Sequence, residues 1–389
     1  MIKQSEKMDL IPFSPIRKIF GEVEKLRSQG IEVISLGIGE PDFDTPAHIC
    51  EAMIDATRAG ATHYTANKGI VPLREAIIEK LKVDNGLEYD IEEIICTVGV
   101  SEGVYVALSA FLNQGDEVLV PDPSWLNYSH VPRLNGAEPI LYPLVAEDDF
   151  RINVDQLEKL VTKNTKILVV LDPSNPTGAI QKKETLEEVA AFAIKHDLLV
   201  ISDEIYEKLI YDGNEHFSIA ALPGMRERTI VLNGFAKAYA MTGWRLGYIA
   251  APEHLIPPMA KFHAYILANA SSMVQHGGVA ALRGSQEPVG LMVNEFLLRR
   301  DFMVRALNEI KGLKCPNPGG AFYIFMDIEE TGMEAETFTE YLLHEAHVAV
   351  VPGTAFGKRA THEVRISYAT SMENLKKAVD RIKAAVEKL

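Results

Sequence analysis

The stretch Asn233-Gly-Phe-Ala-Lys-Ala-Tyr-Ala-Met-Thr-Gly-Trp-Arg-Leu-Gly-Tyr248 places Lys237 among small and aromatic residues, with Arg245 further along. A lysine in such a poorly hydrated setting loses its proton more readily than usual, and the neutral amine can attack a carbonyl. The planar fork of an arginine suits a phosphate. Most lysines are surface residues, however, so this interpretation depends on the other motifs of the chain.

Length and charge restrict the class of protein. A chain of 389 residues predicts two or three domains, and a net charge of −15 argues against a nucleic-acid or anionic-membrane partner. Cys50, Cys96 and Cys315 form no CxxC motif, and no histidines fall at metal-ligand spacing, so we expect a cytoplasmic protein without disulfides or a metal. The polar N-terminus and the absence of an apolar run of about 18 residues predict neither a signal peptide nor a membrane span.

Short apolar runs alternate with longer amphipathic segments along the chain. The runs are rich in β-branched residues and bounded by Gly, Pro, Asp or Asn, which is typical of strands. Predicted strands cover Ile94–Val98, Glu117–Val120, Glu138–Tyr142, Lys166–Leu171, Leu198–Ser202, Thr229–Leu232, Leu246–Ala250, Ala321–Met326, His347–Val351 and Val364–Ser367. Predicted helices cover Pro46–Arg58, Val71–Lys82, Ser101–Asn113, Val154–Val161, Lys183–His196, Gly290–Glu309, Glu334–Glu345 and Met372–Lys388. This alternation implies parallel βαβ units and a layered α/β sheet.

The pattern changes near Pro288, where a long predicted helix is followed by strands that Gly-rich turns separate. This change predicts a smaller α+β domain at the C-terminus. We therefore expect residues 1–45 to form an N-terminal arm and part of the small domain. Residues 46–287 would form the large domain, and residues 288–389 the small C-terminal domain.

Two loops of the predicted large domain could contact a cofactor. Val98-Gly-Val-Ser-Glu-Gly103 leaves a strand and enters a helix, and the free amides at such a helix start bind phosphate. A plain strand-to-helix turn is the alternative. Trp125 lies in the Pro-rich loop Pro121–Tyr128, and its flat indole suits stacking on a pyridine ring. Ordinary core packing would explain this tryptophan equally well.

Two further motifs directly follow predicted apolar strands, at the position where open α/β sheets bind ligands. In Asp172-Pro-Ser-Asn-Pro-Thr-Gly178, Asn175 could donate to a phenolate oxygen or a carboxylate, and a tight turn is the alternative. In Asp203-Glu-Ile-Tyr206, Asp203 could pair with a protonated ring nitrogen, and Tyr206 could donate to a ring oxygen. The alternative for this aspartate is a helix N-cap.

Arg365 lies in a predicted apolar strand, Val364-Arg-Ile-Ser-Tyr368. Burying an unpaired charge is costly, so this arginine needs an anion. A bidentate grip on a substrate carboxylate is one solution, and a structural salt bridge is the other. The run Gly37-Ile-Gly-Glu-Pro-Asp42 lacks the G-x-G-x-x-G spacing of a dinucleotide site, so its glycines indicate close approach of the backbone to a ligand.

Lys237 could bind an aldehyde group and Arg245 a phosphate group. A ligand that carries both groups is pyridoxal 5'-phosphate (PLP). These motifs in this order resemble the class I/II aminotransferases, which are fold-type-I PLP enzymes, and particularly the prokaryotic aspartate and aromatic aminotransferases. The resemblance covers nearly the whole chain, from Gly37 to Tyr368. It implies an α/β fold with three α/β/α layers and a mostly parallel central sheet, plus a smaller α+β domain.

The resemblance also implies a role for each motif residue. Lys237 would form a Schiff base with PLP and shuttle a proton between substrate Cα and the C4' carbon of the cofactor. Asp203 would pair with the pyridine nitrogen, and Tyr206 would bond the ring oxygen. Arg245 and the amides of Val100, Ser101 and Glu102 would hold the phosphate. Asn175 would also bond the ring oxygen, and Trp125 would contact the ring and the substrate. Arg365, Asn175 and the Gly39 backbone would bind the substrate α-carboxylate.

Tyr64, in His63-Tyr-Thr-Ala-Asn-Lys-Gly69, resembles a tyrosine that reaches the phosphate of a neighbouring subunit, which implies a homodimer with shared active sites. The chain departs from the family pattern beside the lysine. Many relatives carry Ser-x-Ser-Lys, whereas this chain has Gly234-Phe-Ala-Lys237 and lacks the hydroxyls. We therefore expect phosphate affinity to depend on Arg245, Tyr64 and the helix amides.

The resemblance implies an aminotransferase that moves an amino group from an L-amino acid to a 2-oxo acid such as 2-oxoglutarate. Some aspartate-specific relatives place a lysine where this chain has Ser101, and the segment Ile11–Ile16 is apolar. We therefore expect neutral or aromatic donors to be favoured, with aspartate as a possible donor. Two alternatives stay open: a PLP-dependent C–S lyase on the same scaffold, and a non-enzymatic PLP-binding regulator.

Overall fold

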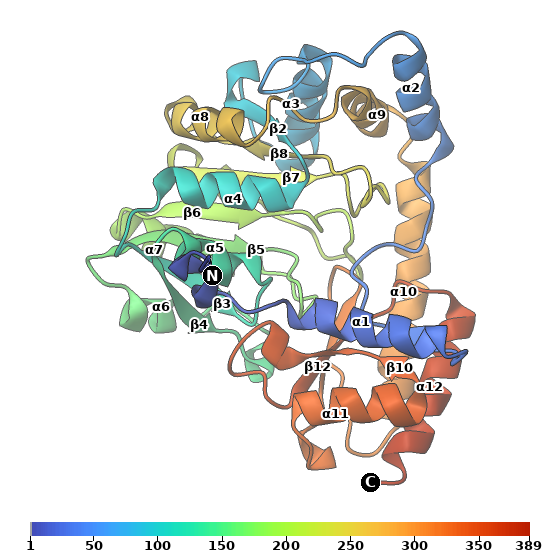
Figure 1. Ribbon diagram of the computed structural model, residues 1–389. Coiled ribbons are helices and arrows are strands. Elements are labelled where there is room, and N and C mark those ends of the chain that lie inside the picture. Colours follow the sequence, from blue (N-terminus) through green and yellow to red (C-terminus); the bar gives the residue numbers. More distant parts are fainter. Residues whose placement is uncertain (1) are drawn as a thin grey trace.

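A computed structural model describes residues 2–389, in which a large α/β part and a smaller part are joined by the long helix α10 (Glu287–Asn308) (Figure 1). The central sheet of the large part has seven strands in the order β2-β8-β7-β6-β5-β3-β4. These strands are β2 (Ile94–Thr97), β3 (Glu117–Asp122), β4 (Glu138–Pro143), β5 (Thr165–Leu171), β6 (Leu199–Asp203), β7 (Thr229–Gly234) and β8 (Gly247–Ala250). Neighbouring strands are parallel from β7 through β4, and β8 runs antiparallel to both of its neighbours. The mostly parallel sheet is therefore confirmed.

Alternating side chains of the central strands enter cores on opposite faces of the sheet. In β5, Ile167 and Val169 pack into one core, while Leu168 and Val170 pack into another. Helices α4 (Val100–Phe111), α5 (Asn127–Leu134) and α8 (Ile256–Ile266) cover the first face. Helices α2 (Ala47–Arg58), α3 (Val71–Asn85), α6 (Val154–Leu160), α7 (Lys183–Lys195) and α9 (Ser272–Arg283) cover the other. This arrangement gives the three α/β/α layers that were predicted.

The smaller part packs helices on an antiparallel sheet. Its strands are β9 (Tyr323–Asp327), β11 (Val351–Pro352) and β12 (Glu363–Ser367), and its helices are α11 (Ala335–Tyr341), α12 (Met372–Val386) and most of α10. Near the chain start, β1 (Ile34–Ser35) pairs in parallel with β10 (Val348–Ala349). This pairing supports the proposal that the first 45 residues contribute to the small domain.

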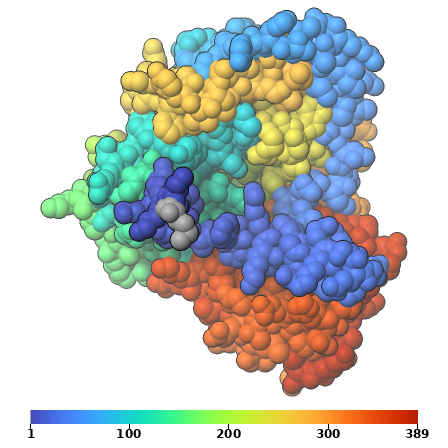
Figure 2. All heavy atoms as spheres, viewed as in Figure 1, coloured from blue at the N-terminus to red at the C-terminus, as the bar shows by residue number. Residues whose placement is uncertain are grey.

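The N-terminal residues extend along the surface of the large part. Helix α1 (Pro15–Ser28) lies across the junction of the two parts (Figure 1). The preceding segment, which includes a short helical turn over Glu6–Leu10, rests against α5 and is the dark blue patch in Figure 2. No helix within residues 2–389 is both long and apolar enough to cross a membrane.

Four helices, α1, α5, α8 and α9, occupy segments for which no helix was predicted. All four contain proline or glycine, which usually interrupt helices, and α8 and α9 show why these residues are tolerated. Helix α8 begins with Pro257-Pro258 in its first turn, where proline is tolerated. Helix α9 contains Gly277-Gly278, at which added Cβ atoms would lie 2.7 Å from Trp244 and 2.6 Å from Leu246. Close helix packing thus explains these glycines.

Candidate active site

A cavity of about 360 Å³ opens where the large part meets the small one. The carboxyl ends of β5, β6 and β7 reach this cavity, because parallel strands end at the same edge of a sheet. Most of the predicted site residues line it: Gly39, Val100, Ser101, Trp125, Asn175, Asp203, Tyr206, Lys237, Arg245 and Arg365. The structure therefore brings together motifs that lie far apart in the sequence.

Lys237 follows β7, lies in the cavity wall and is partly buried. Its Nζ donates to the carbonyl oxygen of Gly39 and lies 5.7 Å from the ring centre of Tyr206 and 5.6 Å from that of Phe322. Burial and the nearby positive charge of Arg365 lower the pKa of this lysine to about 8. A substantial fraction of the amine is therefore neutral near physiological pH, as a nucleophile or a base requires.

Asp203 ends β6 and is held by two hydrogen bonds. Its Oδ2 accepts from the hydroxyl of Tyr128 at 2.8 Å, and its Oδ1 accepts from the amide of Ile205 at 3.2 Å. Burial raises the pKa of Asp203 to about 6, and the hydrogen bond from Tyr128 acts in the opposite direction. A buried carboxylate of this kind suits a cationic ring nitrogen. Sequence reasoning missed Tyr128, although it lies close to Trp125 in the sequence and begins the first turn of α5 with Asn127.

Arg365 is 1 % exposed, and its charge has no acidic partner among residues 2–389. Nη1 donates to Oδ1 of Asn175 at 2.9 Å, and Nη2 donates to the carbonyl oxygen of Gly37 at 2.7 Å. The guanidinium faces the ring of Tyr323, and its buried Nε has no hydrogen-bond partner in the described chain. Residues 2–389 therefore supply no salt bridge to this arginine, and its uncompensated charge suits an incoming carboxylate.

A second tyrosine that the sequence analysis did not identify completes this end of the cavity. The hydroxyls of Tyr206 and Tyr323 lie 2.8 Å apart. A Cβ atom at Gly39 would lie 2.6 Å from the Tyr323 hydroxyl, so glycine allows the backbone to approach the ring. The strand pattern predicted that Tyr323 lies in a strand, but only the fold places it opposite Gly39.

The opposite end of the cavity forms a cradle at the start of α4. Gly99 has φ 73° there, and a Cβ atom at this position would lie 2.6 Å from Nη2 of Arg245. A Cβ atom at Gly247 would lie 2.8 Å from the amide nitrogen of Val100. The amides of Val100 and Ser101 have no backbone acceptor within residues 2–389. Free amides at a helix start beside an arginine fit a phosphate group.

Two predicted phosphate ligands lie outside this cradle. The amide of Glu102 donates to the carbonyl oxygen of Gly99 at 3.2 Å, so it is already used, unlike the amides of Val100 and Ser101. Tyr64 is 87 % exposed and lies outside the cavity. The apolar segment that was expected to shape the substrate pocket reaches the cavity only through Ile16.

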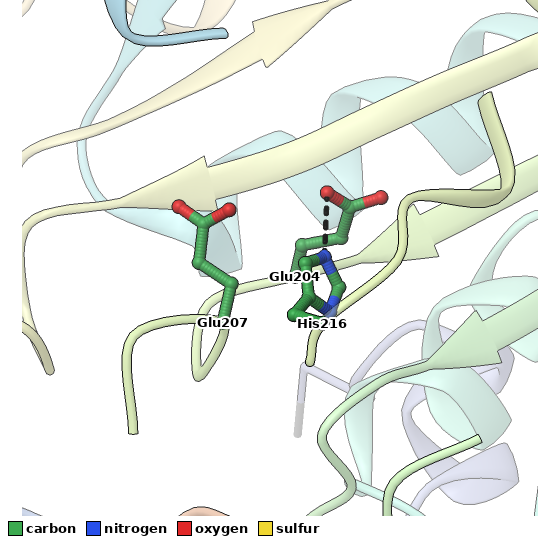
Figure 3. A group of neighbouring side chains, drawn as sticks. All are labelled: Glu204, Glu207 and His216. Atoms are coloured by element: carbon green, nitrogen blue, oxygen red, sulfur yellow. Dashed lines mark hydrogen bonds and ion pairs between the residues drawn. The ribbon is translucent and has the colours of Figure 1, made fainter. Parts of the chain in front are cut away.

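Glu204, Glu207 and His216 form a group of two carboxylates and an imidazole, none of which lines the cavity (Figure 3). The ring of His216 lies between Oε2 of Glu204, at 3.2 Å, and Oδ2 of Asp172, at 3.4 Å. Burial opposes protonation of the ring, but the ion pair with Asp172 and the hydrogen-bonded pair with Glu204 outweigh it and raise the pKa of His216 to about 10. Glu207 pairs with Lys80. These carboxylates thus already face cations of the protein, and we assign no metal to the group.

Comparisons with known proteins agree with this geometry. Residues 31–382 match the family model "Aminotransferase class I and II". An aspartate aminotransferase of Pyrococcus abyssi is 49 % identical, with 97 % of each chain covered. The aromatic-amino-acid aminotransferase 2 of Thermococcus litoralis is 45 % identical, with 98 % of each chain covered.

Solved structures give the same result. The crystal structure of an aromatic aminotransferase from Pyrococcus horikoshii has a TM-score of 0.90 at 47 % identity, over 94 % of this chain and 99 % of that one. An aspartate aminotransferase from Thermus thermophilus with maleate has a TM-score of 0.95 at 39 % identity, over 99 % and 100 % of the two chains. The protein therefore belongs to the class I and II aminotransferases, which are PLP-dependent enzymes.

Proposed function

We propose that this aminotransferase favours neutral or aromatic L-amino acids as donors and passes the amino group to a 2-oxo acid such as 2-oxoglutarate. The charges of the cavity carry this proposal. In the described chain, the cations that line the cavity are Lys237, Arg245 and Arg365, and each has a role in the chemistry proposed below. The remaining wall is rich in apolar side chains, including Ile16 and Phe20. A distal carboxylate would find no further cation of this chain, although aspartate remains a possible donor.

Lys237 would act as both nucleophile and base. When bound, PLP supplies an electron sink for the bond that is broken at substrate Cα. We propose that Nζ of Lys237 would hold the cofactor by condensing with its aldehyde, with loss of water, and that the amine set free by the substrate would carry the proton that leaves substrate Cα. A lowered pKa suits this work, because a base is efficient when its pKa lies near the working pH. Asp203 would hold the proton on the ring nitrogen.

The polar side chains around the cavity would orient the two ligands. Asn175 accepts from Arg365 through its oxygen, which leaves its amide nitrogen as a donor to the ring oxygen of the cofactor. Tyr206 would donate to the same oxygen, and Trp125 would cover the ring. Arg365, with the backbone near Gly39, would hold the substrate α-carboxylate beside the base.

Arg245 and the amides of Val100 and Ser101 would hold the cofactor phosphate. We propose that the exposed Tyr64 completes the phosphate site of a second copy, so that the enzyme is a homodimer with shared active sites. Mixing Tyr64→Ala chains with Lys237→Ala chains tests this arrangement. Each heterodimer would then contain one complete site, and activity would return. Sites built within one chain would give no recovery.

The half-reaction provides the main test of function. The PLP-loaded protein should change its absorbance when an amino-acid donor is added, and 2-oxoglutarate should reverse the change. A panel of donors would rank phenylalanine and methionine above aspartate, and the reverse order would contradict the proposed specificity. Release of pyruvate and ammonia from cystathionine without a 2-oxo acid would favour the lyase alternative. Borohydride reduction followed by peptide mass spectrometry should locate PLP on Lys237.

We also propose a cytoplasmic location. The described cysteines Cys50, Cys96 and Cys315 are all free, and two of them are buried. Unpaired thiols suit a reducing compartment. Cell fractionation with an antibody to the native protein would test this proposal, and recovery outside the cytosolic fraction would contradict it.

A further inference from the structure

His263 lies on α8 with its side chain 0 % exposed, and both of its ring nitrogens face hydrogen-bond acceptors. Nδ1 lies 2.7 Å from Oε1 of Glu102, and Nε2 lies 3.0 Å from the carbonyl oxygen of Asn67. A carbonyl oxygen cannot donate, and an ionised carboxylate cannot either. With Glu102 ionised, both contacts are hydrogen bonds only when both nitrogens carry a proton, that is, when His263 is an imidazolium cation; a protonated Glu102 would instead donate to a neutral ring.

The partner of this cation occupies a position that would otherwise oppose phosphate binding. Glu102 lies in the first turn of α4, beside the amides of Val100 and Ser101 that we assign to the phosphate. An unpaired carboxylate there would repel a dianion. Its side chain instead turns away from the cavity, where Oε2 accepts from the amide of Val98 and Oε1 meets His263.

The second contact of His263 reaches the loop that carries Tyr64. Other hydrogen bonds fix the same loop to the segment after α8. The side-chain amide of Asn67 donates to the carbonyl oxygen of Ala268 at 3.0 Å, and Oε1 of Gln275 accepts from the amide of Ile70 at 2.7 Å. His263 therefore links the start of α4 to the loop that presents the exposed Tyr64.

We propose that His263 is a positioning residue for the cofactor phosphate. Its imidazolium neutralises Glu102 at the helix start, and it fixes the Tyr64 loop relative to the cradle of the same subunit. The phosphate group itself is not contacted by this histidine. The inference rests on the proposed phosphate site and explains how a carboxylate is tolerated within the first turn of that helix.

A double-mutant cycle on the apoprotein tests the charge pairing. PLP affinity would be measured by fluorescence titration for the wild type, His263→Gln, Glu102→Gln and the double variant. We expect His263→Gln to weaken PLP binding by about tenfold, because it leaves a buried carboxylate unpaired near the phosphate. Glu102→Gln should bind nearly as the wild type does, and the double variant should recover most of the lost affinity.

His196→Gln provides a matched control. His196 also meets a glutamate, Glu158, at 3.1 Å, but this pair lies outside the cavity. Its loss should leave PLP affinity unchanged. Wild-type affinity in His263→Gln would overturn the proposal, as would a double variant that binds as poorly as His263→Gln.

A second measurement needs no substitution at position 263. Nitrogen NMR of ¹⁵N-histidine-labelled wild-type apoprotein should show both nitrogens of His263 protonated at neutral pH, and comparison with Glu102→Gln would distinguish its signals from those of the protonated His216. A neutral ring would overturn the proposal even if His263→Gln fails to fold. A wrong assignment of the phosphate site would give a different result from a wrong role for His263. In that case Arg245→Ala would bind PLP as well as the wild type does.

Discussion

Nη1 of Arg365 donates to Oδ1 of Asn175 at 2.9 Å, which joins strand β12 of the small part to the turn that follows β5. The contact fixes the orientation of the asparagine amide as well as the guanidinium. Because the oxygen is occupied, the amide nitrogen is left to face the cavity. This one hydrogen bond thus orients both Arg365, which we propose binds the substrate carboxylate, and Asn175, which we propose contacts the cofactor ring.

Replacing this arginine should affect substrate much more than cofactor. In Arg365→Lys the charge remains but the two-pronged geometry is lost, so we expect KM for amino acids to rise by about 100-fold. PLP affinity of the apoprotein should stay within about twofold of the wild type. Steady-state kinetics and a PLP titration would measure the two effects. An equal loss of PLP affinity would place Arg365 in the cofactor site instead.

Capture of PLP by the apoprotein should depend on pH through Lys237. The reactive form is the neutral amine, and the pKa of Lys237 is lowered to about 8. The capture rate should therefore rise by about tenfold per pH unit well below pH 8 and level off above it. Stopped-flow absorbance would follow the reaction, with Lys237→Arg as the unreactive control. A rate that continues to rise beyond about pH 10 would indicate a lysine with an ordinary pKa.

Tyr128 should support the charge of Asp203. The phenol donates to Oδ2 of Asp203 and favours the carboxylate, so Tyr128→Phe should raise the pKa of Asp203 further above its ordinary value. Less of the carboxylate would then be available to hold a proton on the cofactor ring. We expect kcat to fall by about tenfold, since hydrogen bonds to charged groups contribute about 1.5–3 kcal/mol. Measuring kcat against pH would check this, and an unchanged profile would refute it.

His216 should make stability depend on pH. Its pKa is raised from 6.5 to about 10, so the folded state binds the proton more tightly than the unfolded state. This stabilisation is complete below pH 6.5 and is lost as pH rises through about 10. His216→Gln should lower the free energy of unfolding by about 3–5 kcal/mol near neutral pH, because it leaves buried carboxylates without their cation.

The test is the difference in unfolding free energy between wild type and His216→Gln across this pH range. Comparing the two proteins at each pH cancels the opposite contribution of Lys237, whose lowered pKa favours folding as pH rises. The difference should shrink toward high pH. A difference that does not vary with pH would mean that His216 contributes packing alone.

Most strands and helices were predictable because their hydrophobic periodicity is local, whereas the two-residue strand β1 was not predicted. The residues that line the cavity were predictable where they follow strands, as Asn175 and Asp203 do. Tyr128 and Tyr323 were not, since their partners Asp203 and Gly39 lie far away in sequence and nothing local marks a tyrosine as a hydrogen-bond donor. The hydrogen bond from the amide of Glu102 to the carbonyl oxygen of Gly99 was not predictable either, because it depends on how the first turn of the helix forms and not on the spacing of the motif.

The contact between Arg365 and the carbonyl of Gly37 joins positions 328 residues apart, so it has a consequence for biosynthesis. A ribosome synthesises Lys237, Asp203 and the phosphate cradle well before β12 emerges. Because domains tend to fold in the order in which they are made, the cofactor-binding layers can assemble first. A nascent or C-terminally truncated chain could therefore capture the cofactor before it could recognise an amino acid. Recognition of the substrate would be the last property that the growing polypeptide acquires.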